Sequence, residues 1–206
     1  MEILLKYFPE LTPEQHQQFA ALRDLYTDWN SKINLISRKD IECLYEHHVL
    51  HSLALARIIN FAKNTKILDV GTGGGFPGIP LAILFPSCNF HLVDSIGKKI
   101  KVVENVSQAI GLSNVKAEQA RVENLSEKYD FVVSRAVTTF PELVKWTRKL
   151  VRPGGLNTLP NGFLYLKGGD FEDEIKPFGS KIRIFNISDF FTGEYFETKK
   201  IIYLEI

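Results

Sequence analysis

The chain has 206 residues, 45% of them hydrophobic and 24% charged, and its formal net charge is +1. This length suffices for one well-buried domain with an additional segment, but it is too short for two full domains. The near-neutral charge excludes neither an acidic nor a neutral partner, because a cationic face can be offset by acidic surface elsewhere. The two cysteines, Cys43 and Cys88, form no C-x-x-C pair, which argues against a disulfide framework or a thiolate metal site and favours a reducing compartment.

The N-terminal segment MEILLKYFPELTPEQ does not have the pattern of a signal peptide. It contains acids and a proline where a signal peptide needs a basic head and a longer apolar core, and no window of the sequence reaches the length of a membrane span. We therefore expect a cytoplasmic protein without a membrane partner.

The residues before about position 65 have helical patterning. Thr12 followed by Pro13 is typical of a helix start, with an N-cap and a proline at the first helical position. After the polar break at 30–32, Asp40 is expected to cap a second helical region that continues to Ile58. We therefore predict an N-terminal helical cap over residues 1–64. The first helix is expected to be amphipathic, because apolar side chains recur at helical spacing at Phe19, Leu22, Leu25, Tyr26 and Trp29.

From Lys66 onward, apolar runs alternate with helical patterns, as in a parallel sheet covered by helices on both faces. The predicted strands are Lys66–Val70, Asn89–Val93, Val115–Ala117, Phe131–Ser134 and Phe163–Leu166. The predicted helices are Pro80–Leu84, Lys98–Ile110, Pro141–Leu150 and Phe171–Lys176. Two further strand-like segments, Lys181–Ile187 and Thr198–Ile206, have no helical pattern between them and are expected to close the sheet as an antiparallel pair.

Together these elements predict an α/β fold. We expect a Rossmann-like, mostly parallel seven-stranded sheet with a terminal antiparallel strand, which occupies residues 65–206 and is preceded by the helical cap. In such an open sheet a ligand binds outside the carboxyl ends of the strands, at the point where the strand order reverses.

A glycine-rich loop follows the first predicted strand. The stretch Leu68–Ala82, LDVGTGGGFPGIPLA, has glycines at 71, 73, 74, 75 and 78. Such a loop lets the backbone approach a nucleotide-like ligand closely. Taken from Gly73, the loop fits the G-x-G-x-x-G pattern of dinucleotide-binding proteins. Taken from Asp69, it fits the acid-x-Gly-x-Gly-x-Gly pattern of S-adenosylmethionine-dependent methyltransferases.

Three features favour S-adenosylmethionine over a dinucleotide. Pro77 and Pro80 lie where free helix N–H groups would receive a pyrophosphate, and proline lacks that donor. Asp69 precedes the first glycine by two residues, where its carboxylate can face the cationic methionine end of the cofactor or can simply cap the glycine turn. The terminal antiparallel pair resembles the reversed strand of the class I methyltransferase fold. Asp94 ends the second strand and can bind ribose hydroxyls in either class.

Several blocks of the sequence resemble those of one family, and they occur in the family's order over about Thr12–Gly169. The family is the small-subunit ribosomal RNA methyltransferase G family, also called glucose-inhibited division protein B. Methyltransferases at large do not share the blocks outside the cofactor loop. The resemblance implies transfer of a methyl group from S-adenosylmethionine to N7 of one guanine in 16S ribosomal RNA, with that RNA or the small ribosomal subunit as partner. The blocks are NLIS (Asn34–Ser37), HHVLHSL (His47–Leu53), DVGTGGGFPGIPLAI (Asp69–Ile83), LVDSIGKKIKVV (Leu92–Val103), ARVENL (Ala120–Leu125) and VVSRAV (Val132–Val137).

The resemblance also implies which residues bind the cofactor. The positions that match the family's cofactor contacts are Gly71, Phe76, Val122, Glu123 and Arg135, with Asp94 as the ribose ligand. The loop pattern adds Asp69 and Gly73 to this predicted cofactor-binding set.

The residues after the fourth strand bear on which atom is methylated. Methylation of an amino nitrogen usually requires an Asn/Asp-Pro-Pro-aromatic motif there, whereas this chain has SRAV at 134–137. Methylation of a pyrimidine C5 requires a cysteine nucleophile, and neither cysteine lies at the carboxyl end of a strand. Guanine N7 carries a free lone pair, so its attack needs alignment and no base. We therefore name no catalytic base and take Asn34, His48 and Arg135 as substrate-side candidates.

Other charged and titratable residues have alternative interpretations. His47 and His51, four residues apart, would suit a metal on one helix face, but no glutamate lies between them as in H-E-x-x-H, and we predict no metal. Two basic clusters either contact RNA phosphates or form solvated helix faces, and the sequence leaves both possibilities open. The first cluster is Lys98, Lys99 and Lys101, and the second is Lys145, Arg148, Lys149 and Arg152.

Alternative functions also follow from this pattern. The chain could be a regulatory module that binds S-adenosylmethionine without transferring its methyl group, or a methyltransferase for another RNA, a protein or a small molecule. The intact acid–glycine loop together with Asp94 favours an enzyme. We expect it to act as a monomer.

Overall fold

The computed structural model describes residues 1–33, 35–37 and 40–206. Its centre is a seven-stranded sheet with the order β3-β2-β1-β4-β5-β7-β6. β1 to β5 are parallel, and β7 runs antiparallel to both of its neighbours, β5 and β6. The predicted sheet with its reversed terminal strand is therefore confirmed. The strands are β1 (Lys66–Val70), β2 (Asn89–Asp94), β3 (Val115–Gln119), β4 (Phe131–Arg135), β5 (Gly162–Gly168), β6 (Ile182–Asn186) and β7 (Lys199–Glu205).

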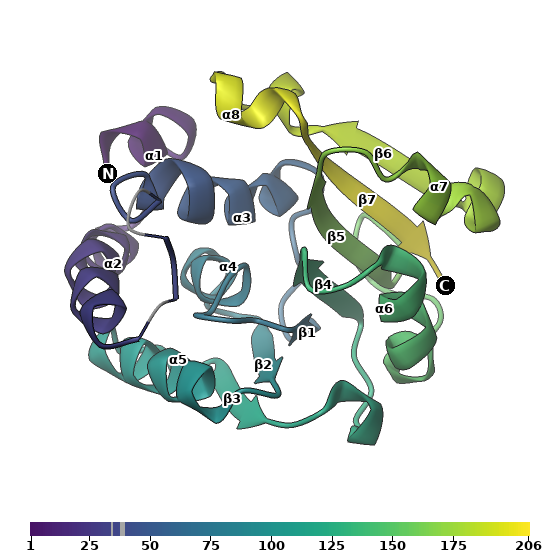
Figure 1. The fold of residues 1–206 in the computed structure, drawn as a ribbon, viewed down its shortest axis with the longest axis horizontal. Helices are drawn as coiled ribbons and strands as arrows, with labels where there is room; N and C mark the ends of the chain where they lie inside the picture. The colour runs from purple at the N-terminus through teal and green to yellow at the C-terminus, as the bar shows by residue number, and fades with distance from the viewer. Residues whose placement is uncertain (34, 38–39) are drawn as a thin grey trace.

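Helices cover both faces of this sheet. In Figure 1, α2, α4 and α5 lie on one side of the sheet and α6 on the other. Each side has its own apolar core, and the larger core joins the N-terminal helices, α4 and α5 to the sheet. The α-helices are α1 (Glu2–Tyr7), α2 (Pro13–Lys32), α3 (His51–Leu53), α4 (Gly78–Leu84), α5 (Gly97–Ala109), α6 (Phe140–Thr147), α7 (Glu172–Ile175) and α8 (Glu194–Glu197).

The start of α2 has the predicted cap. The Thr12 hydroxyl accepts the backbone N–H of Gln15 at 3.2 Å, and the Gln15 side chain accepts the backbone N–H of Thr12 at 3.0 Å. This reciprocal pair satisfies two of the N–H groups that every helix start leaves free. Phe19, Leu22 and Tyr26 are buried along one face, so the amphipathic pattern is also confirmed.

The second helical region differs from the prediction. It is a series of short turns: a π-helix η1 (Leu44–Leu50), α3, and a 3-10 turn η2 (Ala54–Arg57). The expected cap at Asp40 was wrong, because the π-helix begins only after Cys43 and the Asp40 carboxylate instead accepts from Ser37 Oγ at 2.9 Å and contacts His47 Nδ1 at 3.0 Å. π-Helical turns are rare and often occur at functional sites.

Four short elements were not predicted from the sequence, one of them the 3-10 turn η3 (Val122–Asn124) after β3. α1 precedes the first predicted helix, and η6 (Ile187–Asp189) and α8 lie between β6 and β7, where we expected no helix. Each is too short for helical periodicity to show in the sequence. In the described part of the chain, no helix is long and apolar enough to cross a membrane.

The proposed division at residue 64 stays a prediction. Tyr26 of α2 packs on Phe76 of the glycine loop with ring centroids 4.9 Å apart, and its hydroxyl donates to the carbonyl oxygen of Gly74 at 2.7 Å. The helical cap therefore touches the loop expected to hold the cofactor.

Candidate functional site

A cleft of about 510 Å³ opens at the carboxyl ends of β1, β2 and β4. β1 and β4 are neighbours in the sheet, and the chain leaves β1 toward β2 on one side and enters β4 on the other, so the cleft lies at the switch point of the strand order. Five of the eight predicted cofactor-binding residues line this cleft, namely Gly71, Asp94, Val122, Glu123 and Arg135.

The loop after β1 has glycine at three positions with positive φ. Gly71, Gly73 and Gly75 have φ angles of +64°, +58° and +105°, which residues with a Cβ rarely adopt. A Cβ on Gly71 would lie 2.1 Å from Cγ2 of Val137, whereas a Cβ on Gly73 would meet nothing within 4 Å. Gly71 therefore allows the loops after β1 and β4 to approach each other at the edge of the cleft.

Asp94 is held in place at the end of β2. Its Oδ2 accepts the backbone N–H of Gly73 at 3.0 Å, and its Oδ1 accepts that of Ile96 at 2.9 Å. Lys99 Nζ lies 4.0 Å from the same carboxylate. Each carboxylate oxygen can accept a second hydrogen bond, so a fixed carboxylate at the cleft can still receive a ribose diol.

Asp69 lies beneath the loop and does not line the cleft. Its Oδ2 accepts from Thr72 Oγ1 at 2.6 Å and from the backbone N–H of Gly78 at 2.9 Å, which is the turn-capping role considered from the sequence. Burial raises the pKa of Asp69 to about 7, against the opposing effect of these two donors. Among the described residues, its buried Oδ1 has no hydrogen-bond partner. A direct contact with the cofactor stays a prediction.

Phe76 and Gly73 also lie outside the lining of the cleft, and their direct contacts with the cofactor stay predictions. The Phe76 ring is buried against Tyr26, and its face is 5.3 Å from the guanidinium of Arg135. A cation over an aromatic face is attracted by the ring quadrupole. Phe76 therefore supports a residue that does line the cleft.

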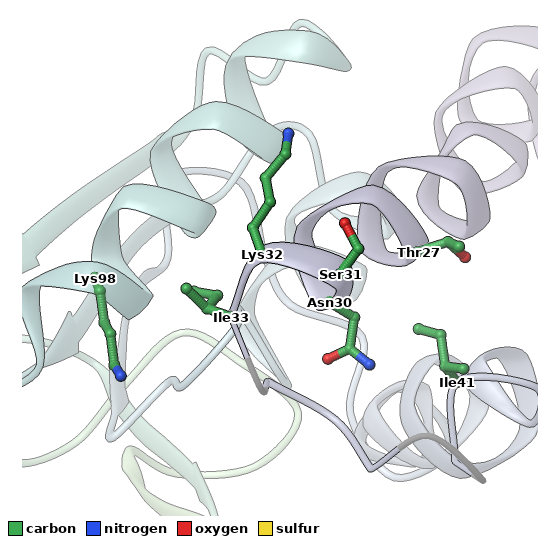
Figure 2. Close-up of a pocket in the computed structure, with 7 residues that line it drawn as sticks. All are labelled: Thr27, Asn30, Ser31, Lys32, Ile33, Ile41 and Lys98. Carbon is green, nitrogen blue, oxygen red and sulfur yellow. The ribbon is translucent and has the colours of Figure 1, made fainter.

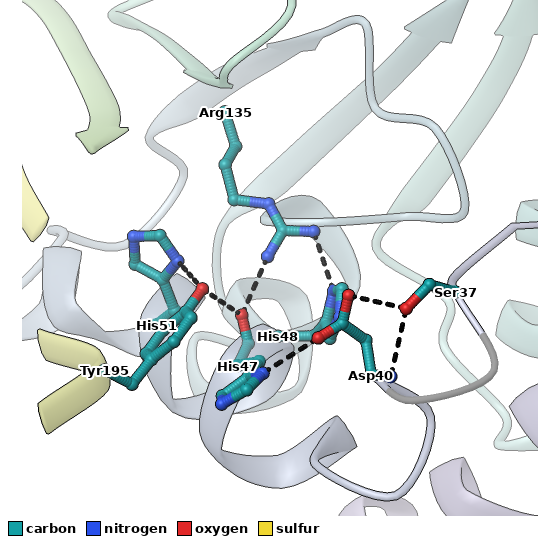
Figure 3. A network of polar contacts seen from close by, with 7 residues as sticks. All are labelled: Ser37, Asp40, His47, His48, His51, Arg135 and Tyr195. Carbon is teal, nitrogen blue, oxygen red and sulfur yellow. Dashed lines mark hydrogen bonds and ion pairs between the residues drawn. The ribbon is translucent and has the colours of Figure 1, made fainter. Parts of the chain in front are cut away.

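Arg135 is bound by the histidine-containing turn (Figure 3). Its Nη1 donates to the carbonyl oxygen of His47 at 3.2 Å, and its Nη2 lies 3.0 Å from Nδ1 of His48. The His47 carbonyl is available because the N–H of His51 bonds to Glu46, five residues back, instead of to His47. Tyr195 of α8 donates its hydroxyl to the same carbonyl at 3.0 Å. The π-helical turn thus supplies an acceptor that a regular helix would use internally.

His48 and His51 are neutral in this arrangement. An arginine can only donate, so Nδ1 of His48 accepts and its ring proton lies on Nε2. Burial, followed by the charge of Arg135, lowers the pKa of His48 to about 3 and holds that of His51 well below its usual value. Within the described residues there is no group of three His, Cys, Asp or Glu side chains that could hold a metal. The predicted candidate Asn34 lies outside the described residues.

Comparison with known proteins identifies the family. Residues 15–201 match the family model described as rRNA small subunit methyltransferase G. The chain belongs to this family. A protein of Bacteroides thetaiotaomicron named ribosomal RNA small subunit methyltransferase G is 59% identical over 206 residues, which is 100% of both chains. The protein of the same name from Cytophaga hutchinsonii is 53% identical over 204 residues, 99% of each chain.

Solved structures agree on the fold. A SAM-dependent methyltransferase from Aquifex aeolicus matches with a TM-score of 0.53 and 17% identity, covering 78% of this chain and 91% of that one. A precorrin-6y C5,15-methyltransferase from Geobacter metallireducens matches with a TM-score of 0.55 and 10% identity, covering 84% and 92%. These similarities confirm the class I methyltransferase fold of this family member.

The structure separates the members of each basic cluster. Lys99 lines the cleft, whereas Lys98 lines a groove of about 530 Å³ between the end of α2 and the start of α5 (Figure 2). In the second cluster, Lys149 donates to the carbonyl oxygen of Glu123 at 2.6 Å, but Arg152 pairs with Asp130 at 3.5 Å, just before the amino end of β4. Arg152 therefore does not share the edge of the sheet that carries the cleft.

Sequence reasoning missed three residues beside Arg135: Asp40 as a side-chain partner of His47, Tyr195, and Lys199 at the start of β7. Tyr195 bonds His51 across 144 residues of sequence, and Lys199 lies 4.6 Å from the Tyr195 ring centroid. No local pattern marks a contact of this range. The only available signal was that Tyr195 lies just before the reversed strand.

Proposed function

We propose that this chain transfers a methyl group from S-adenosylmethionine to N7 of a guanine in 16S ribosomal RNA. The observation that carries the proposal is the cleft at the switch point, where the carboxylate of Asp94 is fixed by two backbone N–H groups, in a chain whose family is the rRNA small subunit methyltransferase G family.

The residues of the cleft fit the cofactor. Asp94 offers a carboxylate for the ribose diol, and the absence of a Cβ at Gly71 leaves the loop backbone open to the ligand. Val122 and Glu123 line the cleft beyond the end of β3, where we place the adenine. Arg135, a cation without a carboxylate among its hydrogen-bond partners in the described chain, suits the carboxylate of the methionine part. When bound, S-adenosylmethionine supplies an electrophilic methyl group.

The chain's own residues then align the reactants. The N7 lone pair forms the new N–C bond while the C–S bond breaks and keeps its electron pair on sulfur, so positive charge moves to the base and no proton leaves. The site therefore needs orientation and charge balance more than a base. His48 and His51 remain neutral and add no charge beside the methylated base.

We further propose that the protein works as a monomer in the cytoplasm on the small subunit or its RNA. Support for the location comes from the family, whose named substrate is the RNA of the small ribosomal subunit. Lys98 and Lys101 are exposed in the first turns of α5, and Lys145, Arg148 and Lys149 are exposed along α6 and the following turn.

Incubation with labelled S-adenosylmethionine tests the function. The substrates are unmethylated 16S RNA and small subunits lacking the modification, and the product is digested to nucleosides. We expect label in 7-methylguanosine, and the Asp94→Ala variant should lose it. Label in another nucleoside would contradict the N7 assignment. No transfer to either substrate, with cofactor binding intact, would favour the regulatory alternative. Comparing the two substrates shows whether RNA alone suffices.

RNA affinity measured against salt tests the two basic faces. Each phosphate contact should contribute about 0.7 to the slope of log affinity against log salt for single-stranded RNA. We expect the triple glutamine variant of Lys98, Lys99 and Lys101, or that of Lys145, Arg148 and Lys149, to flatten this slope. Unchanged slopes in both variants would show that both clusters are solvated faces.

A further inference from the structure

A second pocket, of about 350 Å³, adjoins the cofactor cleft. Arg135 and Ala136 line both cavities, so the two cavities meet at these residues. By contrast, neither the groove beside Lys98 nor a smaller cavity beside Gln15 shares a described lining residue with the cleft. Because methyl transfer requires the reacting atoms to be about 3–3.5 Å apart, the target must bind against the cofactor cleft.

We propose that this second pocket binds the target guanine itself, extruded from the RNA, with N7 toward Ala136 and its Watson–Crick edge toward Asp40 and Lys199. This inference rests on the proposed function and names the base subsite for it. N7 lies in the deep, narrow major groove of an RNA helix, which side chains cannot enter. The base must therefore be presented from a single strand or flipped out of its stack.

The backbone is strained where the two cavities meet. Ala136 has a φ angle of +50°, one of two non-glycine residues with positive φ in the described chain. Such a conformation costs on the order of 1–3 kcal/mol and tends to persist where function requires it. Here it allows the chain to turn sharply at the end of β4, so that a residue with only a methyl side chain lies where the two cavities meet.

Aromatic and charged side chains line the pocket. The rings of His47 and Tyr195 stack 3.9 Å apart at an angle of 12°, and Lys199 Nζ lies 4.6 Å from the Tyr195 ring centroid. Figure 3 shows Tyr195, His47 and Asp40 along one side of the network, with Arg135 facing them. Hydrogen bonds from His47 and Ser37 hold the pKa of Asp40 below its usual value, so Asp40 is a carboxylate at neutral pH.

Asp40 and Lys199 together present the functional groups that distinguish guanine from adenine. Guanine has hydrogen-bond donors at N1 and N2 and an acceptor at O6, and a carboxylate can only accept while an ammonium can only donate. Adenine would place a bare ring nitrogen against the carboxylate and an amino group against the ammonium. The carboxylate also offsets the positive charge that the base acquires on methylation.

The test compares two RNA fragments, one that the wild type methylates and the same fragment with the target guanine replaced by adenine. Affinities are measured with S-adenosylhomocysteine present, so the readout is binding and not turnover. The wild type should prefer the guanine fragment by about tenfold, the usual size of one good base contact. Asp40→Asn and Lys199→Gln should lose the preference, and Lys199→Arg should retain it.

Lys200→Gln is the matched control. Lys200 is the next residue of β7 and donates to Asn186 on the neighbouring strand, outside the lining of the pocket. It should keep the full preference, and all variants should bind S-adenosylhomocysteine like the wild type. A preference that survives both Asp40→Asn and Lys199→Gln, or one that is absent from the wild type, overturns the base subsite. Failure of the wild type to methylate any 16S substrate would instead overturn the proposed function.

Discussion

Replacing Gly71 with alanine should disturb the cleft in a way that the same change at Gly73 does not. Both positions have φ angles near +60°, so alanine at either one costs about 1–2 kcal/mol of backbone strain. At Gly71 the new Cβ also falls 2.1 Å from Cγ2 and 2.8 Å from Cβ of Val137. Overpacking of this kind costs about 1–3 kcal/mol more. We therefore expect Gly71→Ala to lower the free energy of unfolding by about 2–5 kcal/mol and Gly73→Ala by about 1–2 kcal/mol.

Urea denaturation measures this difference, and calorimetry with S-adenosylhomocysteine measures its effect on the cleft. Val137 lines the cleft and is 40% exposed, so it can yield to the new methyl group only by moving within the site. Gly71→Ala should therefore also weaken ligand binding. In the Val137→Gly variant both short contacts are absent. Adding Gly71→Ala to that variant should therefore lower its free energy of unfolding only as much as Gly73→Ala lowers that of the wild type. Equal effects of the two alanine variants, or no recovery in the double variant, would refute the steric argument.

Three further predictions concern charged groups. Asp94→Ala should weaken S-adenosylmethionine binding by about 1.5–3 kcal/mol, the range for a hydrogen bond to a charged group; unchanged affinity by calorimetry would place Asp94 outside the ribose site. The pKa of Asp69 is raised to about 7, and a cationic ligand nearby should favour its ionised form. Cofactor binding should therefore release protons, and the affinity should rise between pH 6 and 8. Calorimetry in different buffers should show binding heats that depend on the buffer, and Asp69→Asn should abolish this dependence. The pKa of His48 is lowered to about 3 in the folded protein, so the unfolded chain takes up the proton first as the pH falls below about 6.5. This difference should lower the free energy of unfolding by about 2 kcal/mol at pH 5. His48→Gln should flatten that dependence in urea denaturation.

Most of the sheet could be predicted because each strand carries its signal locally. The segment 66–70 is a short, mostly apolar run that ends at the glycine loop, and β1 begins and ends at the predicted positions. The reversed strand could be predicted because two strand patterns followed each other without a helix. The helix α8 between them could not be predicted, because its four residues are too few to show helical periodicity.

In the candidate site, too, only residues close together in the sequence could be predicted to act together. The loop glycines and Asp94 lie within one β–α–β unit, so their spacing alone indicated a common ligand. Asp40 was assigned to a helix cap because an acid before an apolar run usually caps. In the structure its side chain turns instead to His47, and only the fold brings Tyr195 and Lys199 to the same place. Side chains joined across such sequence separations have no pattern that one chain's sequence can show.

The protonation states of the histidine turn bear directly on how the reaction can depend on pH. His48 gives its Nδ1 lone pair to Arg135, and both His48 and His51 are held neutral by burial and by the charge of Arg135. Neither ring can exchange a proton in the usual histidine range, and attack by N7 requires no such exchange. The single-turnover rate at saturating cofactor should therefore be level between pH 6 and 8, in His48→Gln as in the wild type. An inflection near pH 6.5 that disappears in His48→Gln would show that this ring does carry a proton during catalysis, and that the neutral turn inferred from the geometry is not the reacting form.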